Sequence, residues 1–163
     1  MNEPRKKYQQ DFIVDKFEKR SIKMRPVSHT KASGRKRKFS AAGVVGDGLG
    51  NVGVAICSSK EASEAIKKCY TRAMKTLIKI PKDGTTIMHD VEAKFCSVRV
   101  LIKKAKKGTG IIAGNVMRDI LEVAGIEDVV CKIIRGKNPL NVAQATIKAL
   151  SELQRVSYFK EGL

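Results

Sequence analysis

Two glycine-rich segments, and the lysines beside one of them, are the parts of this sequence best suited to bind a ligand. The segment over 108–114, Gly-Thr-Gly-Ile-Ile-Ala-Gly, directly follows a run of basic residues: Lys103, Lys104, Lys106 and Lys107. Free backbone N–H groups at a turn before a helix bind phosphate, and lysines would add positive charge. The segment lacks the Gly-Lys-Ser/Thr ending of a P-loop, so a nucleic-acid backbone or an acidic protein surface is the expected occupant. A turn that uses glycine for its backbone shape alone stays open.

The second glycine segment, over 48–53, has the G-x-G-x-x-G spacing of a dinucleotide-binding turn. Such a turn must follow a strand and open a helix, whereas here the third glycine opens an apolar run typical of a strand. A protein kinase is excluded, because Cys57 replaces its strand lysine and neither HRD nor DFG follows. No nucleophile is grouped with a base, so we expect no enzyme. The enzyme alternative is a small phosphotransferase that uses 108–114 to hold phosphate.

Positive charge is the unusual quantity of the composition. Thirty-three Lys and Arg against sixteen Asp and Glu give a formal net charge of +17, and nine of these charges fall within residues 1–38. Solubility needs a net charge of only about 2–8 for a small domain. The excess predicts a polyanionic partner.

Metal ions, other cofactors, membranes and small-molecule substrates are not expected. Four cysteines without a C-x-x-C pair and two isolated histidines do not form a ligand set: Cys57, Cys69, Cys96, Cys131, His29 and His89. No run approaches the roughly 20 apolar residues of a membrane span, and the N-terminus has no signal-peptide core.

The first half predicts three strands and a helix. Ile22 and Met24 alternate with polar residues as in a strand with a basic outer face, and 26–38 is expected to be a loop. Apolar runs over 39–45 and 52–56 flank a glycine- and asparagine-rich hairpin turn. A helical stripe over 62–77 follows a capping-box pattern over 58–61.

The second half predicts the order β-β-α-β-α. The first two elements are antiparallel strands over 87–95 and 98–102, and His89 lies in the first of them. A helix over 112–124 follows and stops at Gly125. A buried strand over 129–134 then leads to a helix that is capped by Asn138 and has Pro139 at its first position.

We therefore expect an α+β protein with two small domains. The N-terminal β-β-β-α half fits a double-stranded-RNA-binding fold without its first helix, and the C-terminal half is a two-layer sandwich. Few aromatic residues (5%) argue against an RNA-recognition motif that stacks bases. The expected divisions are a basic tail over 1–15, the first domain over 16–80, a linker over 81–85, the second domain over 86–154 and a tail over 155–163.

Several of these segments together resemble the bacterial-type small-subunit ribosomal protein S-five family, over about 17–150. The segments, in order, are 39–48, 52–54, 64–66, 108–114, 138–142 and 145–146. The resemblance implies a structural, non-enzymatic protein that binds small-subunit rRNA, supports assembly, and influences decoding accuracy near the mRNA entrance channel. It implies ribosomal proteins S-four and S-eight as neighbours, and a bacterial cytoplasmic or organellar ribosome as the location.

The resemblance and the charge pattern together give the expected contacts. Residues 32–36 match the family's extended basic hairpin, and 103–110 match the part that faces protein S-four. Expected rRNA contacts are Lys31, Gly34, Arg35, Lys36, Arg37, Lys38, Asn51 and His89. Expected contacts with a protein neighbour or rRNA are Lys103, Lys104, Lys106, Lys107, Gly108, Thr109 and Gly110. The chain departs from the family at 32–33, 55–58, 104–105 and 135–137. The alternative function is a free-standing duplex-RNA-binding regulator.

Overall fold

The computed structural model describes the backbone of residues 17–160 and the side chains of residues 17–153. One sheet has the order β1 (Glu18–Lys31), β2 (Gly34–Gly46), β3 (Asn51–Ser59), β4 (Ile78–Lys79). A second has the order β7 (Val91–Phe95), β8 (Val98–Lys104), β10 (Val129–Arg135), β9 (Ile111–Ile112). A small hairpin pairs β5 (Lys82–Asp83) with β6 (Thr86–Ile87), and the helices are α2 (Ala62–Lys75), α3 (Asn115–Val123) and α4 (Pro139–Lys160).

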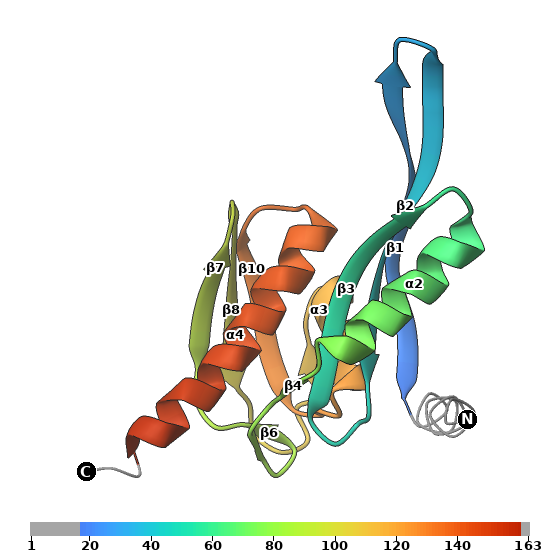
Figure 1. Cartoon of the computed structure of the whole chain (residues 1–163). Coiled ribbons are helices and arrows are strands. Elements are labelled where there is room, and N and C mark those ends of the chain that lie inside the picture. The colour runs from blue at the N-terminus through green and yellow to red at the C-terminus, as the bar shows by residue number, and fades with distance from the viewer. Residues whose placement is uncertain (1–16, 161–163) are drawn as a thin grey trace, which may run out of the picture.

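These elements form layers, and Figure 1 shows their order. Helix α2 packs on strands β2 and β3, and α3 contacts the other side of the first sheet. Helix α4 packs mainly on β7 and β8 while also touching β3, so α3 and α4 lie between the two sheets. This arrangement confirms the predicted α+β class with an N-terminal and a C-terminal part.

One hydrophobic cluster crosses both parts. Val44 and Val52 of the first sheet share it with Ile102, Leu121 and Leu150 of the second part, and all five are fully buried. Apolar burial at about 25 cal/mol per Å² favours keeping such surfaces together. The division at 81–85 therefore stays a prediction from sequence, because the parts on either side share a core.

Gly125 ends α3 where the sequence predicts, and nothing larger fits there. Its φ is 71°, in the left-handed region. A Cβ at this position would lie 1.9 Å from the carbonyl oxygen of Gly48 in the β2–β3 turn. The Nζ of Lys82 donates to the carbonyl oxygens of Gly48 and Gly125, at 2.9 Å each, and joins these two turns to β5.

Two details of the helix starts differ from the sequence prediction: the cap of α2 and the first residue of α3. Helix α2 begins at Ala62 after Glu61, which makes no side-chain cap, so the capping box over 58–61 is wrong. The Ser59 hydroxyl bonds the Glu64 carboxylate instead. Helix α3 begins at Asn115 rather than at 112, because 111–112 form β9, which pairs in parallel with β10.

The predicted cap at the start of α4 is confirmed. The Leu140 backbone N–H donates to the Asn138 Oδ1 at 3.3 Å. The helix continues to Lys160, so most of the segment expected as a tail from 155 extends α4. The expected N-terminal tail over 1–15 lies outside the described residues.

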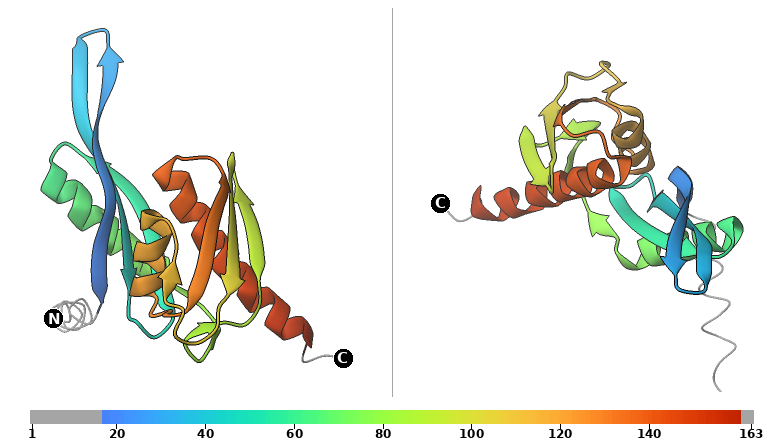
Figure 2. Two further views of the ribbon diagram at one scale, coloured as in Figure 1. Left: turned by 180° about the vertical axis from the view of Figure 1, so that it is seen from behind. Right: turned by 90° about the horizontal axis from the view of Figure 1, so that it is seen from above.

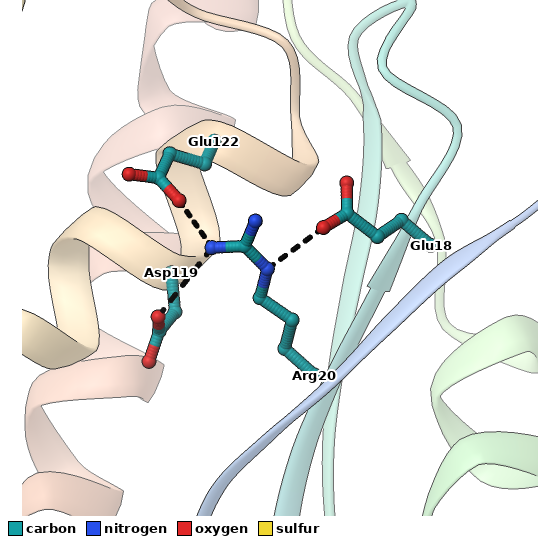
Figure 3. Close-up of polar contacts among 4 residues, drawn as sticks. All are labelled: Glu18, Arg20, Asp119 and Glu122. Carbon is teal, nitrogen blue, oxygen red and sulfur yellow. Dashed lines mark hydrogen bonds and ion pairs between the residues drawn. The ribbon is translucent and has the colours of Figure 1, made fainter.

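Arg20 of β1 reaches three carboxylates, two of them on α3 (Figure 3). Its Nε lies 2.7 Å from Glu18, and its Nη1 bonds Glu122 and lies 3.7 Å from Asp119. The hydrogen bonds to Glu122 and then to Glu18 raise the pKa of the guanidinium. The cluster joins the edge of the first sheet to the second part of the chain.

We expect Arg20→Met, which keeps most of the apolar stem, to lower the free energy of unfolding by about 1 kcal/mol, since the groups are one-third or more exposed. Urea unfolding at low salt would measure the loss. The difference between variant and wild type should shrink in 1 M salt, because the salt screens the ion pairs of Arg20 in the wild type. A salt-independent difference would contradict the electrostatic account.

Candidate nucleic-acid interface

The predicted basic contacts lie on a two-stranded ribbon made by the outer halves of β1 and β2. The strands pair antiparallel from Glu18↔Gly46 to Lys31↔Gly34, with a two-residue turn at its tip. Strand β3 pairs with β2 only as far as Phe39↔Ser59. Beyond that pair no further strand of the described part of the chain joins the ribbon, and Figure 1 shows it projecting from the body.

The expectation of a loop over 26–38 is therefore wrong. Nearly every side chain from Met24 to Lys38 is exposed, so neither face carries the alternating apolar residues that mark a half-buried strand. The turn uses Gly34, whose φ of 114° suits glycine. The resemblance, which implied a hairpin here, agrees with the structure better than the hydrophobic pattern.

The ribbon displays cations on both faces. Directly paired residues share a face, so Lys36 and Lys38 lie on one face, opposite His29 and Val27. Arg35 and Arg37 lie on the other face, opposite Thr30 and Ser28. Lys31 stands beside the turn, and all these cations are exposed.

No acidic residue occurs between Lys19 and Gly46, so the whole ribbon is uniformly basic. The prediction stopped at Lys31 and missed Lys23 and Arg25 at the ribbon's base, although the absence of acidic residues in this span was a usable signal. Arg25 reaches Asn138 at the start of α4, at 3.4 Å. A two-stranded ribbon with cations on both faces can contact phosphates of two RNA segments.

Asn51 and His89 lie apart from the ribbon. The side-chain amide and backbone N–H of Asn51 bond the Asp47 carboxylate in the β2–β3 turn, which is at the other end of β2 from Gly34. Burial alone would raise the pKa of Asp47, but hydrogen bonds from Asn51 and Leu49 outweigh it and lower that pKa. His89 is half-buried between β6 and β7, so its predicted place within a strand is wrong.

The lysine run forms a second basic surface at the end of β8. Lys103 and Lys104 close the strand, and Lys104 pairs with Asp83 at 2.5 Å. The exposed Lys106 and Lys107 help to line a shallow hollow of about 630 Å³ that β5 and β6 complete. Figure 1 places β6 at the end of the molecule opposite the ribbon tip, so the two basic surfaces are well separated.

The glycine turn after the lysines does not offer free amides. The N–H groups of Gly108 and Gly110 donate to one carboxylate oxygen of Asp128, at 3.0 and 2.9 Å. The Thr85 hydroxyl donates to the other oxygen at 2.7 Å, and Thr109 bonds the carbonyl of Lys106. The interpretation of this turn as a phosphate cradle is therefore wrong, since an internal carboxylate already fills it.

Asp128 is the residue that sequence reasoning missed here. The hydrogen bond from Thr85 and then the N–H of Gly110 lower its pKa, against the opposing effect of burial. Its folded-state pKa lies below the ordinary value of 3.8, so its contribution to stability is present above that value and is lost as the pH falls through the folded pKa.

We expect Asp128→Ala to lower the free energy of unfolding at pH 7, because two backbone N–H groups and the Thr85 hydroxyl lose their acceptor. Thermal unfolding of variant and wild type at pH 7 and at pH 3 measures this. The gap between their midpoints should narrow at pH 3. An equal gap at both pH values would show that the carboxylate charge is not what fixes the turn.

Comparisons with known proteins agree with the two-part architecture. Residues 17–81 match the family model described as ribosomal protein S5, N-terminal domain, and residues 93–162 match ribosomal protein S5, C-terminal domain. A curated relative, the small ribosomal subunit protein uS5 of Chloroflexus aurantiacus, is 40% identical over 137 residues, which are 84% of this chain and 77% of the relative.

Fold, basic surfaces and these matches define a ribosomal protein. The chain belongs to the ribosomal protein S5 family, as its residues suggested. The family consists of structural components of the small ribosomal subunit. None of the helices within 17–160 is long and apolar enough to cross a lipid bilayer.

Proposed function

We propose that this chain binds rRNA through the ribbon of β1 and β2 and so supports assembly of the small subunit. The observation that carries the proposal is the acid-free span from Lys19 to Gly46, built into a ribbon with exposed cations on both faces. RNA duplexes are recognised mainly by shape and backbone, which suits arginine and lysine better than the few aromatic residues here.

Within this proposal, the cations on the two faces of the ribbon near its tip bind phosphates in different ways. Lys31, Lys36 and Lys38 neutralise phosphates on one face, while Arg35 and Arg37 make bidentate phosphate contacts on the other. Gly34, with its positive φ, lets β2 begin directly after the two-residue turn at the tip. Asn51 and His89 lie outside the ribbon and would contact rRNA only at separate places.

The lysine run meets a neighbour at the other end of the molecule. Lys103, Lys106 and Lys107 would face rRNA or an acidic patch of protein S-four, with protein S-eight as a second neighbour. In this role Gly108, Thr109 and Gly110 shape the loop, and Lys104, which is engaged with Asp83, contributes less charge. The placement near the mRNA entrance channel and the influence on translational accuracy rest on the family resemblance.

The role is structural rather than catalytic, on the ribosome of a bacterial cytoplasm or of an organelle. The alternative, a free-standing regulator, draws on the same β-β-β-α half, which resembles a double-stranded-RNA-binding domain. Such a regulator would bind generic RNA duplex as tightly as small-subunit rRNA.

The salt dependence of affinity tests the phosphate-binding mechanism. With about six to ten phosphates neutralised, affinity for a small-subunit rRNA transcript should fall by ~10³–10⁵ between 50 and 200 mM salt. Filter binding across that range gives the slope of the logarithm of affinity against the logarithm of salt concentration. A flat response would remove the proposal.

A further inference from the structure

The second sheet has a face that no helix within residues 17–160 covers. Helix α4 packs on one side of β7 and β8, where Ala93, Val98, Val100 and Ile102 are buried. Seen from behind, in the left view of Figure 2, β7, β8 and β10 lie in front of α4, and no helix of residues 17–160 crosses them. The composition of this outer face therefore indicates what it meets.

A row of cations runs across three strands of this face. Lys94 of β7 pairs directly with Arg99 of β8, and Arg99 pairs directly with Arg135 of β10. Direct partners in antiparallel strands point to the same face and lie about 5 Å apart. All three side chains are exposed. Like charges placed directly opposite each other destabilise a sheet, so a compensating negative charge would stabilise this row.

The side chains of residues 17–153 supply only part of that charge. Arg99 pairs with Glu92 at 3.2 Å, and both side chains are about half exposed. Within residues 17–153, no carboxylate pairs with Lys94 or Arg135. Two cations of the row thus remain uncompensated.

Two further cations extend the row over the same face. Lys132 lies opposite Leu101, and Lys103 lies opposite Val130, with both lysines exposed. The face therefore carries five cations and one carboxylate on adjacent strands. It carries no aromatic side chain that could stack a base, so a ligand would be held by its phosphate backbone.

We propose that this outer sheet face is a second rRNA-binding surface, which holds the phosphate backbone of an RNA duplex. The inference rests on the proposed function, because it takes rRNA as the partner. It adds a surface that is separate from the ribbon and that shares only Lys103 with the lysine run at the end of β8. A protein partner is the competing occupant, since Ile112 and Ile134 are half exposed on the β9 and β10 side of the sheet.

The test compares Lys94→Gln/Arg135→Gln with the control Lys67→Gln/Lys75→Gln, whose exposed lysines lie on α2. Both variants lose two charges, and Arg99 keeps its pair with Glu92. Affinity for a small-subunit rRNA transcript alone is measured from 50 to 300 mM salt. The salt slope of the sheet variant should fall by about 1.4–1.8, at 0.7–0.9 for each lost phosphate contact, and the control slope should stay at the wild-type value.

Equal slopes for the sheet variant, its control and the wild type would overturn the inference. Reduced incorporation into small subunits without a change in rRNA slope would also overturn it, because the face would then dock a protein. A ribbon variant measured alongside separates the two proposals. If it loses affinity while the sheet variant does not, only this inference fails. If neither loses affinity, the proposed function fails as well. Equal thermal unfolding midpoints for all variants show that folding is intact.

Discussion

Replacing Arg35, Lys36 and Arg37 together by alanine should lower affinity for a small-subunit rRNA transcript on the order of 10²-fold at 0.1 M salt. Each lost phosphate contact removes about 0.7–0.9 from the salt slope, so three contacts account for that factor. The fold should survive, because these side chains are exposed and no residue from Met24 to Lys38 belongs to either hydrophobic cluster.

A matched variant on α2 separates position from total charge. Lys67→Ala/Arg72→Ala/Lys75→Ala also removes three exposed cations, and alanine preserves the helix. Filter binding at several salt concentrations should show a nearly unchanged slope for this control. Equal losses in the two triple variants would mean that net charge, and not the ribbon, determines binding.

Gly125→Ala should lower the free energy of unfolding by about 3 kcal/mol or more, a large part of the total stability of a domain of this size. Two costs combine. The left-handed φ of 71° strains any residue with a Cβ, and that Cβ would lie 1.9 Å from the Gly48 carbonyl oxygen, so the two turns joined by Lys82 must separate.

Gly84→Ala is the matched control for this change. Gly84 also has a left-handed φ, 64°, but a Cβ there meets no atom within 4 Å. It should cost only the backbone strain, about 1 kcal/mol. Urea unfolding measures both variants. Equal losses would show that the contact between the turns of Gly48 and Gly125 contributes nothing.

Sequence reasoning located the ribbon's cations but assigned them to a loop. Hydrophobic alternation identifies a strand only when one face is buried, and this ribbon has water on both faces. The apolar runs around 39–45, 52–56 and 129–134 have a buried face, and the strands expected there are present.

Other features depend on which residues meet across the fold, and local sequence does not contain that information. Asp128 lies about twenty residues from the glycine turn that it holds, so the turn's amides looked free. Lys94, Arg99 and Arg135 form a row only because of the strand register, which includes an irregularity between Ile133 and Arg135. The hydrophobic core shared by the two parts could not be predicted for the same reason, since its residues are far apart in the sequence.

Co-sedimentation through a sucrose gradient is the decisive experiment on whether this chain is a constituent of the small ribosomal subunit. The chain should migrate with purified small subunits of its source at one copy per particle and remain bound after a wash at moderate salt. A chain that stays at the top of the gradient, or that binds at a variable substoichiometric ratio, would contradict the claim and favour a free-standing RNA-binding regulator.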